Sequence, residues 1–282
     1  MIKKILIGIL FLPVVLEASW YFLPNQWVEQ KIESTLGSII AHRRITADIH
    51  SLKKGLPFRF SVENISLTRQ DHPLISMEEV SGSINPLSIL SSYISINARG
   101  EVSDGVLDSV MDIAPEGVLL NFHIEDLDIE RLPLSGLLGI NGRGKLRGRG
   151  SIYISLYNRE LKRFNYVGSV EDILLKDISI GGDIIPLSLF ESSLFTVRLK
   201  RKDYFLMKGI LKGDGVTGFF NVKIEGFKLS GFIDIITEED YKKKEKLARI
   251  SDFAGDNYYY IPFKGNISKL FKKKIFYPQI GD

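Results

Sequence analysis

The residues most suggestive of chemistry lie between 139 and 150, where glycines alternate with basic side chains in the sequence GINGRGKLRGRG. Such a tract could bind phosphate, because glycine-rich turns at a helix N-terminus surround the phosphate groups of nucleotides. That site requires a helix immediately after the turn. The segment that follows here, SIYISLY, alternates apolar and other residues with the period of a strand. We therefore predict that the tract is itself a strand.

A strand places alternate residues on opposite faces, which divides the tract into two sets. One face carries the glycines and Leu146, and the other carries Arg143, Lys145, Arg147 and Arg149. We interpret the first face as closely packed and the second as solvated, because glycine permits close approach and outward charges protect exposed sheets. Two functional alternatives remain for the four cations: contact with an anionic surface such as lipid head groups, and a nucleotide site.

Other residues capable of chemistry do not form a recognisable site. No two histidines have the spacing of a helical metal site, and the chain has no cysteine, so zinc binding and cysteine catalysis are not expected. Asp126, Asp128 and Glu130 share the polar face of a predicted strand, where solvation is the common outcome. The sequence contains no nucleophile elbow, phosphate-binding loop or metalloprotease motif. We predict no enzymatic activity and no cofactor.

Size and charge restrict the partners of the protein. The chain has 282 residues, enough for one large domain or two ordinary ones, and its net charge is only +3. A general nucleic-acid binder would be more basic, so no nucleic-acid partner is expected. Basic residues cluster at 242–246 and 272–274, and these clusters could face anionic lipid or an acidic partner.

The N-terminus predicts a membrane anchor. Two lysines precede an apolar run over residues 5–16, and residues 18–23 continue it after Glu17. If Glu17 is included, residues 5–23 form a segment about long enough to span a bilayer as a helix. The lysines favour a cytoplasmic N-terminus, and Trp20 and Tyr21 suit the far membrane interface. A signal peptide cleaved after Ala18 is the alternative.

We expect the uncleaved anchor, which makes the protein a single-pass protein of the inner membrane with its bulk in the periplasm. The predicted domains are a transmembrane anchor over 1–24 and a periplasmic β-rich domain over 25–282, with a sub-boundary near 115 as one option.

The rest of the chain is mostly of strand character. After Arg44, alternating segments follow one another, separated by glycine, asparagine, aspartate or proline. Helical patterns are expected only at 25–40, 86–92, 132–140 and 238–253. We predict a mainly β (α+β) fold, with an N-terminal transmembrane helix followed by an elongated, twisted, mostly antiparallel sheet with a few short helices.

One face of this sheet is apolar. The residues that define it are Phe58, Phe60, Val62, Ile65, Leu67, Leu120, Phe122 and Ile124. The alternation slips by one residue near Asn64, which predicts a β-bulge there. An apolar face can fill a core beneath helices or line an empty groove that holds lipid, and the periodicity fits both.

The order of these elements resembles the type II secretion system protein N family, in the form found in spirochaetes and delta-proteobacterial relatives. More distantly it resembles the AsmA-type periplasmic β-groove proteins. The segment VENISLTRQDHPLISMEEVSGSINPLSILSSYISI is similar to an early unit of both. Three later stretches resemble the narrower family: LDIERLPLSGLLGINGRGKLRGRGSIYI, TEEDYKKKEKLARISDFAG and YYYIPFKGNISKLFKKKIFYP.

The resemblance implies an inner-membrane-anchored periplasmic accessory or structural component of a type II secretion system, without catalytic residues. The implied partners are the inner membrane and proteins of the secretion system or the envelope. The more distant likeness implies a second function, in which the groove shelters phospholipid or lipopolysaccharide on its way to the outer membrane.

Overall fold

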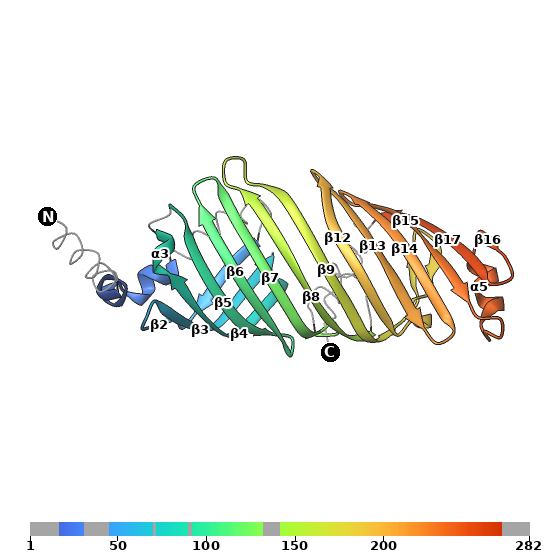
Figure 1. Cartoon of the computed structure of the whole chain (residues 1–282), viewed down its shortest axis with the longest axis horizontal. Coiled ribbons are helices and arrows are strands. Elements are labelled where there is room, and N and C mark those ends of the chain that lie inside the picture. The colour runs from blue at the N-terminus through green and yellow to red at the C-terminus, as the bar shows by residue number, and fades with distance from the viewer. Residues whose placement is uncertain (1–16, 31–44, 70–71, 90–91, 132–141, 267–282) are drawn as a thin grey trace, which may run out of the picture. The chain divides into compact units, whose positions relative to one another are not determined.

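A computed structural model of the chain describes residues 17–30, 45–69, 72–89, 92–131 and 142–266 (Figure 1). These residues form mainly β-strands in a large antiparallel sheet with few helices, which confirms the predicted mainly β fold. Within these ranges, no helix combines the length and the apolar character needed to cross a bilayer. Residues 1–16 of the predicted anchor lie outside the described part of the chain.

The strands follow one another in the chain with short connections between most of them. They are β1 (Ile45–His50), β2 (Lys53–Gly55), β3 (Arg59–Arg69), β4 (His72–Asn85), β5 (Ile94–Val102), β6 (Gly105–Ala114), β7 (Gly117–Asp128), β8 (Gly142–Ser155), β9 (Glu160–Leu175), β10 (Ile178–Ile180), β11 (Asp183–Ile185), β12 (Ser192–Arg201), β13 (Tyr204–Gly213), β14 (Val216–Glu225), β15 (Lys228–Thr237), β16 (Phe253–Ala254) and β17 (Tyr258–Asn266). In the main sheet the order is β1-β3-β4-β5-β6-β7-β8-β9-β12-β13-β14-β15-β17-β16, and β2 pairs with β3. Strands β10 and β11 form a separate hairpin.

Within the described residues, helices occur inside three of the four ranges predicted to be helical. Helix α3 (Pro86–Ile89) begins where expected, and the Ser88 hydroxyl donates a hydrogen bond to the Asn85 carbonyl at 2.5 Å. Residues 25–30 are helical, whereas the rest of the segment predicted over 25–40, and the helix predicted over 132–140, lie outside the described residues.

The prediction of a helix over 238–253 is wrong at both ends, and Phe253 belongs to β16. Helix α5 covers only Lys244–Ile250, and turns precede it. The Glu238 amide donates instead to the Gly215 carbonyl at 3.0 Å, and Tyr241 packs against the core. The sequence favours a helix here through the i,i+4 pairs Glu238–Lys242 and Glu239–Lys243. Such pairs stabilise a helix by only about 0.2–0.5 kcal/mol each, so these tertiary contacts outweigh them.

Contacts divide the chain into two compact units. Unit 1 comprises Met1–His123 and Ile152–Glu160, and unit 2 comprises Ile124–Ser151 and Leu161–Asp282. Each unit has its own cluster of buried apolar residues.

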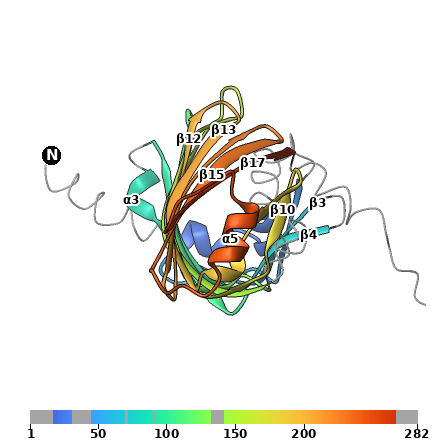
Figure 2. The same cartoon turned by 90° about the vertical axis from the view of Figure 1, so that its right-hand side faces the viewer.

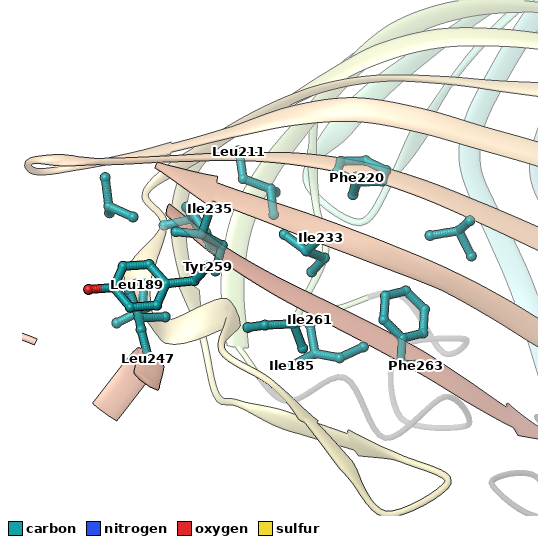
Figure 3. Packing of buried hydrophobic residues seen from close by; sticks show 13 residues of the cluster. Ile185, Leu189, Leu211, Phe220, Ile233, Ile235, Leu247, Tyr259, Ile261 and Phe263 are labelled. Atoms are coloured by element: carbon teal, nitrogen blue, oxygen red, sulfur yellow. The ribbon is translucent and has the colours of Figure 1, made fainter. Parts of the chain in front are cut away.

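The core of unit 2 lies on the inner side of its curved strands. Figure 2 shows α5 and β10 enclosed by the curve of β12, β13, β15 and β17. Leu247 of α5 is fully buried, as is Ile235 of β15. Figure 3 shows the cluster from close by, with side chains of β15 and β17 gathered near Leu247, Leu189 and Ile185. In unit 2 the inner face of β13 to β15 and β17 is therefore covered by the chain's own α5, its short 3-10 helix η2 (Leu187–Leu189) and the β10–β11 hairpin.

The core of unit 1 includes residues from the N-terminal helical segments. Trp20 and Val28 are buried in one cluster with Ile49, Leu52, Phe58, Val62 and Val80. Trp20 also donates its indole N–H to the Gly55 carbonyl at 3.3 Å. Trp20 is therefore part of the protein core, which corrects the prediction that it lies at the membrane interface.

Candidate functional site

The predicted apolar face divides into two groups in the structure. Phe58 and Val62 are buried in the unit 1 cluster, and Phe60 and Ile65 pack against it partly buried. The remaining residues, Leu67, Leu120, Phe122 and Ile124, are half-buried, and neither described cluster includes them. The structure thus brings together half of the candidate face as an ordinary core.

The bulge predicted near Asn64 is wrong in position. The β3–β4 pairing is in register from Val62 to Leu67 and shifts only between Leu67 and Thr68. The nearest irregularity lies on the facing strand, where Glu79 has a φ of 49° and the β4–β5 register shifts between Glu78 and Ser81. A facing strand can bend the sheet as effectively as an extra residue in β3 would.

The inner face of unit 2 is apolar over several rows of paired residues, which the sequence analysis did not single out. One row runs across the sheet through Phe195, Gly209, Phe220, Ile233 and Ile261. Phe220, Ile233 and Ile261 belong to the buried cluster, and Phe195 packs against it. This row is filled by the protein's own side chains.

The glycine tract forms β8 and has the predicted two faces. A Cβ added to Gly148 would lie 2.5 Å from the Val167 carbonyl and 2.7 Å from the Gly168 Cα atom, so β9 approaches closely at this point. The Tyr166 ring fills the space over these glycines, and its hydroxyl donates to the Arg147 carbonyl at 3.2 Å. Burial raises the pKa of Tyr166 to about 12. This face is a packed surface with no space for a ligand at Gly148.

The opposite face of β8 carries a cross-strand ladder of ion pairs. Arg143 lies 3.2 Å from Glu130, Lys145 lies 4.0 Å from Asp128, and Arg147 lies 2.5 Å from Asp126. Arg147 also contacts Glu171 of β9 at 2.7 Å. Three of the four candidate cations are therefore paired with carboxylates of β7, β9 or the turn that follows β7.

The charge ladder alters the acidity of its most closely paired members. The hydrogen bond from Arg147 lowers the pKa of Asp126, and the same hydrogen bond raises the pKa of Arg147. The Asp126 side chain is 52% exposed and the Arg147 side chain 47%, so solvent screens the attraction between them. The carboxylates neutralise the cationic face of β8 locally. Of its four cations, Arg149 is the one without a carboxylate partner among the described residues.

A second polar arrangement connects the elements that cover the inner face of unit 2. The Asp177 carboxylate accepts hydrogen bonds from the Lys246 ammonium of α5 at 2.6 Å and from the Ser188 amide of η2 at 3.0 Å. Partial burial acts to raise the pKa of Asp177, but these hydrogen bonds outweigh it and hold the pKa below the ordinary value of 3.8. Asp177 thus connects α5 to η2 on the inner side of the sheet.

We expect Asp177→Asn to lower the melting temperature of unit 2 by a few degrees at neutral pH. A depressed pKa means that the carboxylate stabilises the folded state above pH 3.8, and that this contribution is lost as the pH falls through the folded pKa. The difference between variant and parent should therefore shrink below pH 3.8. Thermal melts across pH measure it, with exposed Asp256→Asn as the control. A difference that grows on acidification would contradict this role.

The outer face of unit 2 carries apolar side chains that are not covered. An open pocket of about 450 Å³ lies over β9 and β12 to β15. Three of the side chains that line the pocket are exposed: Leu194 at 56%, Phe219 at 41% and Val167 at 42%. Leu194 and Phe219 belong to one row, because each pairs with Ile210. We call Val167, Leu194, Ile210 and Phe219 the outer patch.

The outer patch was not predicted, although adjacent phenylalanines in one strand of the sequence indicate it. Phe219 and Phe220 are adjacent in β14, so a strand must direct one of them to each face. Phe220 is 8% exposed and lies in the core, which leaves Phe219 outside. Adjacent apolar residues in an alternating strand therefore indicate that both faces are apolar.

In the part of the chain that the structure describes, no group of three or more histidine or acidic side chains is arranged to hold a metal ion. No protein family, curated protein or solved structure matches this chain.

Proposed function

We propose that the protein is a structural accessory component of a type II secretion system, anchored in the inner membrane by its N-terminal apolar segment, with its β-rich part in the periplasm. The observation that carries the proposal is the coverage of the inner sheet face of unit 2 by α5, η2 and the β10–β11 hairpin. Because the chain's own side chains fill this inner face, a partner protein would have to bind the outer surface of the unit. The order of sequence motifs, which resembles that of the type II secretion system protein N family, supports the choice of this apparatus.

The outer patch is the surface best suited to such binding. Apolar side chains exposed together mark protein contact sites more often than scattered single residues do. The patch lies on paired strands, so its residues keep a fixed spacing, which favours a defined partner over nonspecific adhesion. The charge ladder is a weaker candidate, because its cations are already paired with carboxylates.

The test is photo-crosslinking in cells from positions in the outer patch. A photoreactive phenylalanine at Leu194 or Phe219 should form adducts with a protein of the secretion apparatus, identified by mass spectrometry. Phe227 is the matched control, because it is an aromatic residue that is 62% exposed in the same unit but outside the patch. Equal adducts from all three positions, or none from the patch, would contradict the proposal.

A lipid-handling groove is the second candidate function. It is favoured by Leu120, Phe122 and Ile124 of β7, which are half-buried and belong to neither core cluster as described. Apolar side chains of this kind suit an acyl chain, because burial of apolar area stabilises by about 25 cal/mol per Å². This candidate makes lipid the occupant of the inner face near β7.

A further inference from the structure

The N-terminal end of unit 1 exposes aromatic and apolar side chains close together. Phe22 is 81% exposed, Tyr21 62% and Leu56 58%. They line one open pocket of about 660 Å³ together with Pro57 and Pro86. Tyr21 and Phe22 come from the N-terminal helical segment, whereas Leu56 and Pro57 come from the turn between β2 and β3. We call this set the N-terminal apolar patch.

The two parts of the N-terminal apolar patch are firmly connected. The ammonium group of Lys54 donates hydrogen bonds to the carbonyls of Trp20 at 2.8 Å, Tyr21 at 3.0 Å and Leu23. These are carbonyls at the end of a helical segment, which lack partners within the helix and attract a cation. Lys54 also lies 5.6 Å from the Trp20 ring centroid.

A carboxylate strengthens the same connection from the other side. Glu17 accepts a hydrogen bond from the Phe58 amide at 3.1 Å, directly after the β2–β3 turn. Together with Lys54 this contact fixes the helical segment against the turn at both of its ends. The exposed side chains of the segment and of the turn therefore keep their positions relative to one another.

We propose that the N-terminal apolar patch inserts into the interface of the phospholipid bilayer, so that the β2–β3 turn forms a second membrane contact beside the anchor. The inference rests on the membrane anchoring proposed above. Residues 5–16, immediately before the patch, are apolar and without charge, so a chain anchored by them would leave the bilayer at the patch. Aromatic side chains favour the membrane–water interface.

The chemistry of the patch fits lipid. Leu56, Pro57 and Phe22 have no polar side-chain atoms, and the charged groups next to them, Glu17 and Lys54, are already engaged in hydrogen bonds. A bilayer interface also requires no shape match, only apolar burial, which an open and shallow pocket provides. The β2–β3 turn would then fix the orientation of the unit 1 sheet relative to the membrane surface.

The test uses the full-length chain in phospholipid vesicles. Because the chain has no cysteine, single cysteines can carry a polarity-sensitive fluorophore without other changes. Leu56→Cys is the test position, Phe22→Cys reports the anchor itself, and Tyr157→Cys, in the β8–β9 turn of unit 1 and 82% exposed, is the control. Emission is compared in vesicles of ordinary phosphatidylcholine and of brominated phosphatidylcholine.

We expect blue-shifted emission and loss of intensity in brominated lipid at positions 22 and 56, and neither effect at 157. Quenching at 22 without quenching at 56 would overturn the second membrane contact and leave the anchor intact. Equal effects at 56 and 157 would also overturn it, because contact would then not be specific to the patch. Absence of quenching at all three positions, with the protein not floating with the vesicles, would overturn the membrane anchoring itself.

Discussion

Leu247→Ala should lower the free energy of local unfolding in unit 2 by about 2–5 kcal/mol, because it removes a fully buried side chain and leaves a cavity. Leu247 is the fully buried residue of α5 and lies in one cluster with side chains of β15 and β17, with Ile250 packed beside it. Amide hydrogen exchange in those two strands measures the loss, since their hydrogen bonds open when the cover is weakened.

The matched control for this change is Leu174→Ala in β9. It deletes the same atoms from a side chain that is 70% exposed, and a surface change of this kind usually costs no more than about 0.5 kcal/mol. Similar exchange rates in the two variants would mean that α5 does not seal the inner face. The claim that the chain itself fills the inner face of unit 2 would then lose its main evidence.

Gly148→Val should destabilise the β8–β9 pairing by about 1–3 kcal/mol through overpacking. The added atoms would meet the Val167 carbonyl and the Gly168 Cα atom, which belong to the backbone and cannot rotate away. Hydrogen exchange across β8 and β9 should therefore accelerate. The Tyr166 ring would also have to leave its place over the glycines.

Two variants separate this effect from a general loss of glycine. Gly255→Val places its Cβ no closer than 3.8 Å to other atoms, so it should be tolerated. Arg147→Gln, on the opposite face of β8, should leave exchange almost unchanged because the ion pair is solvent-exposed. A larger effect from Arg147→Gln than from Gly148→Val would mean that the ladder, and not the packed face, stabilises this part of the sheet.

The two faces of β8 could be predicted from sequence because a strand has a fixed period and the tract keeps it without interruption. The ion-pair ladder could not. It depends on which residues of β7 and β9 lie opposite the cations, and register between strands is a property of the fold.

The phase of β7 shows the same limit. The sequence analysis assigned Leu120, Phe122 and Ile124 to an apolar face and Asp126 to a polar face, although all four are even-numbered. The structure resolves this conflict at Asp126, where φ is 54° and the alternation shifts, so that Leu127 is buried. An unusual backbone angle at one aspartate reverses the phase. The apolar residues of the sequence do slip from Ile124 to Leu127, but that slip does not identify the residue whose backbone absorbs it.

Tertiary contacts also decided the extent of α5 and the place of Trp20. Local pairs favoured a long helix, but the segment before Lys244 contacts the β14 turn and the core instead. Trp20 has the residue type of a membrane interface, yet Lys54 and Gly55, distant in sequence, bring it into the protein. Sequence predicts what a residue can do, and its partners determine which of those roles it takes.

The central claim is that the inner face of unit 2 is filled by the chain itself, and photo-crosslinking from that face in cells tests it most directly. Phe220 belongs to the buried cluster of unit 2 and Phe195 packs against it, so a photoreactive phenylalanine at either position samples this face. We predict adducts within the chain at both positions. Strong adducts to phospholipid or lipopolysaccharide at Phe195 and Phe220 would contradict the claim and favour the lipid-handling groove instead.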